Sequence, residues 1–332
     1  MSVQWVVRKS MGAVFLISVL FSSGCKKDNL SVDYTIHNLP TNSKVRGIYK
    51  HNGKYLLVGG DRSYSGFILQ AAYGEWEIAD VISDTLPHNV YDVRFEGGRY
   101  TFGAEEGETY FTSIDLEKIT KNWISEENWI KDPNKKPMRR WLQTNTVLGS
   151  FIASGGDWDR GVIYQSLDSG LTWVPHEVDH DLRTVAYDGN GTVWTAGYGL
   201  LMKKSTGEES WTTVRLENVF TTDILFLSSS DAVMSTYDGQ FLRSSDGGFT
   251  WRKEHGGRGV SGVGSINSLL RVNENLIIAF GNNGNYCESL DNGQSWKCDP
   301  LDHGKDMTKG IVDDNGNVLI GMEGGKLLEI IY

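Results

Sequence analysis

The chain has 332 residues, a length that suggests two domains or one large one. Glycine is abundant, with 39 residues, whereas proline is rare, with 6, and aromatic residues make up 11%, so the composition excludes disordered and collagen-like chains. The formal net charge of -10 opposes attraction to a phosphate backbone, and we expect no nucleic acid among the partners. Three cysteines and seven scattered histidines form no metal-ligand pattern, so we expect no metal and no cofactor.

The first residues have the pattern of a targeting segment. Arg8 and Lys9 precede an apolar run over residues 13–21, which is too short to cross a membrane and is followed by small residues and Cys25. This arrangement resembles a bacterial lipoprotein signal, although Ser22 stands where such signals usually carry an aliphatic residue.

The resemblance implies that residues 1–24 are removed, that Cys25 is lipidated and that residues 25–30 form a short tether. It also implies a place in the bacterial cell envelope, as an outer-membrane lipoprotein that is surface-exposed or faces the periplasm. An acyl anchor would hold the chain on the membrane without crossing it. The alternative is an ordinary cleaved signal in which the cysteine is incidental.

One motif recurs along the rest of the chain. Residues 166–173, 244–251 and 289–296 fit the pattern Ser-x-Asp-x-Gly-x-Ser/Thr-Trp, and weaker copies end at Trp76 and Trp211. The defining residues are Ser166, Asp168, Gly170 and Trp173, then Ser244, Asp246, Gly248 and Trp251, then Ser289, Asp291, Gly293 and Trp296. The tryptophans that end the last four copies are 38, 40 and 45 residues apart, which predicts a chain of repeated units.

Each motif lies between two strand-like runs, so we expect it to form a hairpin loop. Its Ser and Asp oxygens can accept hydrogen bonds from turn amides, its Gly permits a positive φ, and its Trp buries a large ring. The pattern resembles the Asp-box (BNR) repeat of sialidases and other β-propellers. In that family the box is a folding element away from the catalytic face, which implies a structural role for these acids.

A second signal, a strand that ends in Gly or a small residue, recurs at residues 56–59, 100–103, 152–155, 194–197, 233–236, 278–281 and 318–321. Together the two signals predict a single all-β domain over residues 31–332. We expect a seven-bladed β-propeller of four-stranded antiparallel blades, with six or eight blades as alternatives. The last unit stops after its third strand, so the N-terminal strand at residues 31–37 should complete it and close the ring. Residues 123–137 are expected to form an inserted excursion.

Cys287 and Cys298 flank the third box, on strands that should face each other. In an oxidising envelope compartment this pair can form a disulfide. The alternative is two small apolar thiols on a blade surface.

In such a blade the loops between the second and third strands share one face, the rim face, with the links between units, whereas the boxes lie on the opposite, Asp-box face. Binding residues are expected on the rim face, because a rigid scaffold usually carries its function on loops. The candidates are Arg46, Asp61, Arg62, Arg140, Trp158, Arg160, His180, Arg183, Asp223 and Lys309. Their basic members either converge into an anion-binding field or are incidental at solvated strand ends.

The overall pattern is similar to the photosystem II stability/assembly factor-like propellers, which implies a basic patch that binds a protein partner. By position in the repeat, Arg46, Arg140, Arg183 and Lys309 are the counterparts. We therefore expect a non-catalytic module that binds an envelope protein or a glycan, or assists assembly. The alternative is a sialidase-like or other glycoside hydrolase that uses Asp157 and Asp159, although the Arg-Ile-Pro tripeptide of sialidases is missing.

Overall fold

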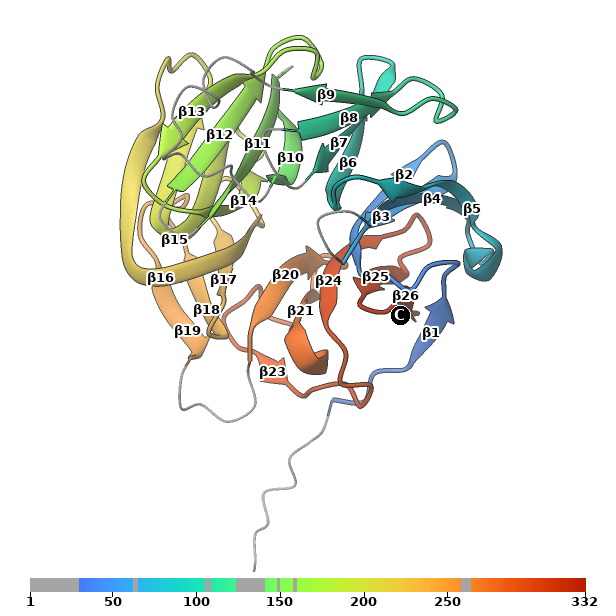
Figure 1. The fold of residues 1–332 in the computed structure, drawn as a ribbon. Coiled ribbons are helices and arrows are strands. Elements are labelled where there is room, and N and C mark those ends of the chain that lie inside the picture. Colours follow the sequence, from blue (N-terminus) through green and yellow to red (C-terminus); the bar gives the residue numbers. More distant parts are fainter. Residues whose placement is uncertain are drawn as a thin grey trace, which may run out of the picture.

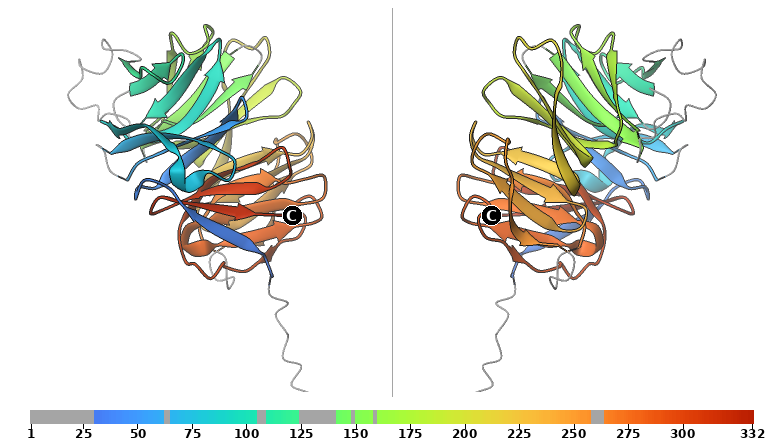
Figure 2. Two further views of the ribbon diagram at one scale, coloured as in Figure 1. Left: turned by 90° about the vertical axis from the view of Figure 1, so that its right-hand side faces the viewer. Right: turned by 90° about the vertical axis from the view of Figure 1, so that its left-hand side faces the viewer.

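Antiparallel β-sheets stand around a common axis in the computed structural model, which describes residues 30–61, 65–104, 109–123, 141–147, 150–157, 160–257 and 264–332 (Figure 1). Seen from the sides, the sheets lie beside one another with their connecting loops on the two faces of the ring (Figure 2). The chain is thus an all-β propeller, as the repeats predict.

Five sheets have four strands each. In four of them the strands follow one another in chain order. The first two consist of β2 (Val45–His51), β3 (Lys54–Gly59), β4 (Gly66–Ala72) and β5 (Asp80–Leu86), and of β6 (Val90–Glu96), β7 (Arg99–Ala104), β8 (Thr109–Ser113) and β9 (Thr120–Trp123). The other two consist of β10 (Trp141–Val147), β11 (Ser150–Asp157), β12 (Arg160–Ser166) and β13 (Val174–Val178), and of β20 (Ile266–Arg271), β21 (Ile277–Gly281), β22 (Tyr286–Ser289) and β23 (Lys297–Cys298). The fifth joins β24 (Met307–Val312), β25 (Val318–Met322) and β26 (Lys326–Ile330) to β1 (Tyr34–Asn38). Two short 3₁₀ helices, η1 (Trp76–Ile78) and η2 (Asn282–Gly284), lie in loops.

The remaining sheet differs from the expectation of separate four-stranded blades. It has six strands, β14 (Leu182–Tyr187), β15 (Thr192–Ser205), β16 (Thr212–Phe226), β17 (Ala232–Thr236), β18 (Gln240–Ser244) and β19 (Arg252–Gly256). The physical reason is continuity of the chain, because β16 pairs with β15 from Thr212 to Arg215 and again at Phe220, and then pairs with β17 from Thr221 onward. A residue with positive φ, Asn218, lies between Arg215 and Phe220.

The N-terminal strand closes the ring. β1 pairs with β26 from Tyr34 opposite Ile330 to Asn38 opposite Lys326, so the strand expected at residues 31–37 completes the last sheet. Next to this ladder, His37 Nε2 lies 2.7 Å from Glu329 Oε2. The pairing covers the edge of β26 and joins the two ends of the chain in one sheet.

The core consists of layers between neighbouring sheets. One cluster joins Leu57 and Phe67 to Leu319 and Leu327 of the last sheet. Because a second strand such as β21 has neighbours on both of its faces, all five of its residues are buried and its sequence is almost continuously apolar. This explains why these strands appear in the sequence as continuous apolar runs rather than as an alternation of apolar and polar residues.

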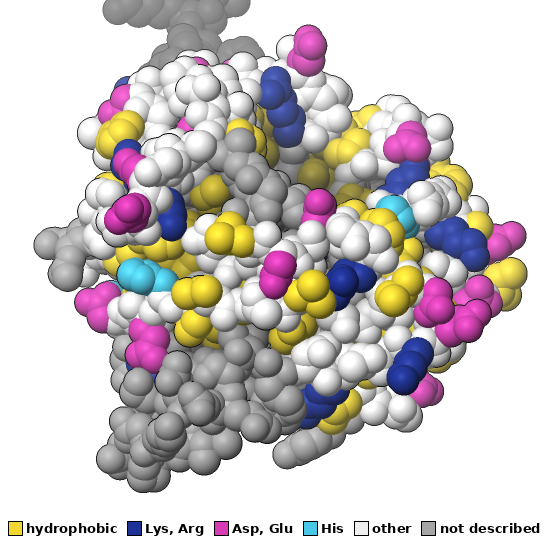
Figure 3. All heavy atoms as spheres, turned by 90° about the horizontal axis from the view of Figure 1, so that it is seen from above, with side chains coloured by type: hydrophobic (Ala, Val, Ile, Leu, Met, Phe, Trp, Pro, Cys, Tyr) yellow, Lys and Arg dark blue, Asp and Glu magenta, His cyan; other side chains and the backbone are white. Residues whose placement is uncertain are grey.

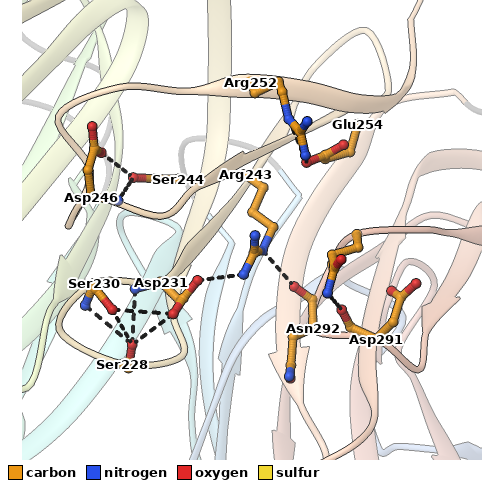
Figure 4. Close-up of polar contacts among 12 residues, drawn as sticks. Ser228, Ser230, Asp231, Arg243, Ser244, Asp246, Arg252, Glu254, Asp291 and Asn292 are labelled. Carbon is orange, nitrogen blue, oxygen red and sulfur yellow. Dashed lines mark hydrogen bonds and ion pairs between the residues drawn. The ribbon is translucent and has the colours of Figure 1, made fainter.

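Each box is a turn held by its own side chains. The carboxylate of Asp168 accepts hydrogen bonds from the Thr172 amide at 2.8 Å and the Thr172 hydroxyl at 2.6 Å, and Ser166 Oγ accepts from the Gly170 amide at 2.8 Å. The same contacts recur around Asp246, where Ser244 and Asp246 are drawn in Figure 4, and around Asp291. These acids therefore serve as acceptors within their own loops.

The boxes also attach each sheet to the preceding one. The ring of Trp296 stacks on Phe241 of β18 with centroids 3.9 Å apart. In the same contact region, the guanidinium of Arg243 donates one hydrogen bond to the carboxylate of Asp231 at 2.5 Å and another to the carbonyl of Asn292 at 3.3 Å (Figure 4). Close by, the chain forms a disulfide between Cys287 and Cys298, on the two strands that flank the third box.

We predict that Gly293→Ala destabilises the fold more than a comparable change in an open turn. Gly293 has a φ of +80°, and an added Cβ would lie 2.5 Å from Val233 Cγ2 of the preceding sheet. Gly316→Ala is the matched control, since Gly316 has a φ of +86° with nothing within 4 Å of its Cβ position. We expect the control to lose about 1–2 kcal/mol from left-handed strain, and Gly293→Ala about 1–3 kcal/mol more from overpacking. Equal losses of unfolding free energy in urea for the two variants would contradict the role of the box in attaching its sheet to the preceding one.

We predict that the contribution of Asp168 to stability fades in acid. Burial by itself would raise the pKa of Asp168, but hydrogen bonds from Thr172, Ser166 and the Leu171 amide outweigh it and lower the pKa to about 2. A lowered pKa stabilises the folded state above the unfolded value of 3.8, and this contribution disappears as the pH falls toward 2. The difference in unfolding free energy between the native chain and Asp168→Asn, measured at pH 6 and at pH 2.5, should therefore shrink in acid; a constant difference would contradict it.

Candidate functional site

The innermost strands share a β-bulge where they begin on the rim face. In β2, β6, β10, β14, β20 and β24 the pairing register shifts by at least one residue near the start of the strand, and in β16 it shifts where the pairing with β17 begins, between Thr221 and Asp223. A bulge leaves an extra residue outside the ladder and redirects its side chain. Arg46 and Arg183 occupy this position in β2 and β14.

A repeated backbone contact holds the bulges in place. The amides of Gly60, directly after β3, and of Tyr198, within β15, donate hydrogen bonds at 3.0 Å to the carbonyls of Lys44 and Asp181, two residues before the bulged arginines. At the strand ends, a Cβ on Gly59 or Gly197 would lie 2.0 or 1.8 Å from those same carbonyls. The glycine at the end of each of these apolar runs is therefore needed because the bulged strand leaves no room there for a side chain.

The two bulged arginines are held in different ways. Arg46 donates from Nε to the carbonyl of Gly60 at 2.9 Å and lies 4.7 Å above the ring of Tyr91. Arg183 forms an ion pair with the buried Asp181 at 2.6 Å. Arg46 makes no ion pair with any residue that the structure describes, so its charge is available to a partner.

Further cations of the rim face that the structure describes are paired with acids. Lys44 Nζ lies 3.0 Å from Asp306 Oδ2, and Lys305 lies 3.6 Å from Glu323. Burial by itself would raise the pKa of Asp306, but hydrogen bonds from Lys44 and the Asn283 amide outweigh it and lower that pKa. The expected field of converging positive charge is thus reduced by pairing.

Asp223 is the centre of a buried network and pairs with Lys309 at 3.2 Å. Its carboxylate also accepts hydrogen bonds from the Thr184 hydroxyl at 2.8 Å and the Ser268 hydroxyl at 3.0 Å, together with two backbone amides. Four inner strands therefore meet at one carboxylate. Two of the sequence candidates, Asp223 and Lys309, lie together, but they satisfy each other rather than face a ligand freely.

This network lines a cavity of about 420 Å³ along the axis of the ring. Besides Asp223 and Lys309, the cavity is bordered by Tyr49, Tyr91 and Arg94. Arg94 pairs with the buried Asp92 at 3.1 Å, so the charges along this cavity come in opposite pairs.

Aromatic rings extend from the bulge of β14 across the rim face. The guanidinium of Arg183 lies 5.1 Å from the ring of Phe220, which stacks with Tyr237 at 5.3 Å and meets Tyr198 edge-on at 5.5 Å. His180 meets Tyr198 at 5.8 Å. Tyr198 and Tyr237 are 44% and 54% exposed and offer an aromatic surface beside the arginine.

Other sequence candidates are placed differently. The carboxylate of Asp61 accepts a hydrogen bond from the Lys44 amide at 2.9 Å and so shapes a turn. Arg160 begins β12, at a half-buried position. Arg62, Arg140, Trp158, Asp159 and Cys25 lie outside the described residues, as do the excursion over residues 124–137 and the side chain of Asp157. The relative placement of the carboxylates of Asp157 and Asp159, the two catalytic acids expected from the sequence, therefore lies outside what the structure describes.

Sequence reasoning missed several members of this site, among them Phe220, Tyr237, Asp92 and Arg94. A signal for Tyr237 was present, because it follows the small residue that ends its strand, as Tyr198 does in the preceding unit. Asp92 likewise holds the register position of Asp223, directly after the bulge. Aligning all units on the bulge would have revealed both.

Acidic and basic side chains lie interspersed among hydrophobic ones on the side of the molecule that Figure 3 shows, seen from above the view of Figure 1. Within the described ranges, no group of three or more His, Cys, Asp or Glu side chains is placed to hold a metal ion. Searched over the same residues, the chain has no helix with the length and apolarity needed to span a membrane.

Comparison with known families decides the affiliation. The model of the family described as photosynthesis system II assembly factor YCF48 matches residues 156–329, more than half of the chain. The chain belongs to this family. The resemblance to assembly-factor propellers that the repeats suggested is thereby confirmed.

Photosystem II assembly lipoprotein Ycf48 of Synechococcus sp. (strain CC9902) is 25% identical over 146 residues, which make up 41% of this chain and 43% of that relative. The chain therefore matches less than half of that relative's length.

Solved structures of the YCF48 family share the fold. A structure described as YCF48 bound to D1 peptide has a TM-score of 0.67 at 16% identity, over 92% of this chain and 97% of that one. YCF48 from Cyanidioschyzon merolae has a TM-score of 0.66 at 15% identity, over 90% and 98%. The WD40 β-propeller domain of Doa1 reaches 0.66 at 11%, over 91% and 97%, so at these identities the similarity establishes the fold and not the activity.

We predict that Asp223→Ala destabilises the chain far more than Lys309→Ala. Removing the carboxylate leaves a half-buried ammonium, two hydroxyls and two amides without their acceptor, whereas removing the lysine leaves Asp223 with four hydrogen bonds. The expected losses are about 3–5 kcal/mol and about 1 kcal/mol. Equal losses in chemical denaturation would show that the ion pair, rather than the network, is what stabilises the axis.

Proposed function

We propose that this member of the YCF48 family is a non-catalytic assembly module that binds an extended segment of an envelope protein through its rim face. The observation that carries the proposal is Arg46, a half-buried cation that the bulge of β2 places on the rim face and that forms no ion pair with a described residue. An acidic side chain or a terminal carboxylate is the group that such a guanidinium recognises.

The aromatic surface of Tyr198 and Tyr237 supports a peptide as the ligand. Exposed aromatic rings are enriched where proteins bind one another, because they bury much area at a small cost in entropy. One structure with this fold is described as YCF48 bound to D1 peptide, and a protein segment is the corresponding partner that we infer here.

We also propose that the ring has seven blades. The two ends of β15 lie together, with Thr192 Oγ1 and Ser205 Oγ 3.2 Å apart, although a straight strand of 14 residues would span about 45 Å. β15 thus doubles back at Gly199, whose φ is +65°, and supplies two strands. Counting it twice, and dividing β16 at Asn218, turns the six-stranded sheet into two four-stranded blades.

The N-terminal segment completes the proposal. Residues 1–24 act as a lipoprotein signal, Cys25 carries the lipid, and the residues that follow tether the propeller, which begins near residue 31. The curated Synechococcus relative is named a lipoprotein, which supports this arrangement. The location that follows is the cell envelope, at the surface of a membrane.

We predict that Arg46→Glu releases the partner. Like-charge juxtaposition costs several kcal/mol, so the protein captured by the tagged full chain from detergent-solubilised envelope should fall by at least about tenfold. Arg252→Glu is the matched control, because Arg252 is a 77% exposed arginine on the outer strand β19. Quantitative mass spectrometry of the captured proteins measures the effect.

Full capture by Arg46→Glu would refute the rim site. An equal loss with Arg252→Glu would show that overall charge, and not this position, governs binding.

A further inference from the structure

Exposed hydrophobic side chains are distributed unevenly between the two faces of the ring. Among the described residues, thirteen large hydrophobic side chains are exposed, and Tyr198 and Tyr237 are the two that lie on the rim face. Nine lie in loops that follow the third strand of a sheet or at the C-terminus: Tyr73, Ile78, Ile114, Leu167, Leu171, Phe249, Leu290, Ile331 and Tyr332. Val81 and Val174 lie near the starts of the adjacent outer strands.

These loops share the Asp-box face. The hairpins between first and second strands lie on the same face, since the amide of Gly247 in a box donates to the carbonyl of Ser230 in such a hairpin at 2.7 Å. Three of the exposed side chains belong to the boxes themselves, Leu167 at 76%, Leu290 at 74% and Phe249 at 54%, and Ile78 and Ile114 in the corresponding loops of two other sheets are exposed to 76% and 75%. The ring of Phe249 meets that of Trp194 edge-on at 6.0 Å and lies 4.5 Å from Lys203 Nζ, yet more than half of its surface stays exposed. The box chemistry does not require an apolar residue at any of the three box positions.

The chain also enters the fold on this face. Tyr34 pairs with Ile330, and Ile330 pairs with Val318 beside the hairpin at residues 313–317, so β1 starts at the Asp-box face and runs toward the rim face. Leu30 and Val32 already pack against the core. Four residues, 26–29, separate Cys25 from Leu30, and the five Cα–Cα steps between them can span at most about 17 Å.

We propose that the Asp-box face is a membrane-contact surface whose apolar box tips, Leu167, Phe249 and Leu290, dip into the headgroup region of a lipid bilayer. This inference rests on the lipid anchor proposed above, since a lipid on Cys25 holds this face against the bilayer and turns the rim face away from it. A single acyl chain binds a membrane only marginally, and a second contact makes the attachment stable.

A bilayer fits these tips better than a protein does. The tips stand on separate sheets around the ring, and a fluid surface can receive all of them at once. Asp168, Asp246 and Asp291 lie in the same loops and bring negative charge to this face. Neutral phosphatidylethanolamine and phosphatidylcholine should therefore be preferred to anionic lipids.

The cysteine content of the chain allows a direct test. Cys287 and Cys298 are bonded to each other, and Cys25 is the third cysteine, so an engineered thiol can be labelled selectively. The acylated full chain is reconstituted into phosphatidylethanolamine–phosphatidylcholine vesicles with an environment-sensitive dye on Leu167→Cys or Phe249→Cys. Tyr237→Cys, on the rim face and similarly exposed, is the matched control. We expect the dye emission to shift to shorter wavelength at the first two positions and to remain water-like at the control.

Water-like emission at Leu167→Cys and Phe249→Cys would overturn the proposal. A shift that occurs in native envelope vesicles but not in pure lipid would also overturn it, in favour of a protein partner.

A second measurement distinguishes membrane binding by the Asp-box face from membrane binding by the lipid on Cys25. Mass spectrometry of Cys25 tests the anchor alone. In the full chain with Cys25→Ser, the fraction that floats with neutral vesicles should fall when Leu167, Phe249 and Leu290 are all changed to Ser, and should be unaffected by Tyr198→Ser with Tyr237→Ser. Equal flotation of the two variants would refute the membrane-contact surface even where Cys25 is acylated.

Discussion

Pairing between β1 and β26 joins the two ends of the chain, and the ring depends on it. A series of sheets that pack side by side leaves one surface of the first and last sheets open unless they meet. Here the last sheet borrows its outer strand from the N-terminus, and the cluster around Leu57, Phe67, Leu319 and Leu327 fills the junction. The same pairing determines on which face the N-terminal segment leaves the propeller.

The repeated units carry a β-bulge on the rim face and, in three of them, a box on the Asp-box face. On the rim face a β-bulge redirects one side chain, and because the bulge is held by backbone contacts, that residue is free to vary: it is Arg46 in β2, Tyr91 in β6 and Arg183 in β14. On the Asp-box face the side chains themselves make the turn, so the pattern recurs. The binding residues that we propose therefore lie where the backbone, and not the side chain, maintains the fold.

The repeats predicted the propeller, the closing strand and the two faces because their signals are local. A box such as residues 289–296 makes most of its hydrogen bonds within eight residues, so its loop can be recognised without knowing its neighbours. The continuity of β15 and β16 was not predictable, because Gly199 and Asn218 bend those strands without any loop that would mark a boundary. Pairing of the rim cations was also hidden, since Lys309 meets an acid 86 residues away in sequence.

The sequence by itself determined what depends on turn chemistry and on the burial of continuous apolar strands: an all-β ring of repeated units, its N-terminal closure, and the structural use of Asp168, Asp246 and Asp291. Only the tertiary structure decided which charges remain available, because ion pairs such as Arg183 with Asp181 and Lys309 with Asp223 depend on distances between side chains brought together by folding. It also decided that the exposed apolar tips and the start of β1 share one face, because that arrangement follows from strand pairing across the closed ring.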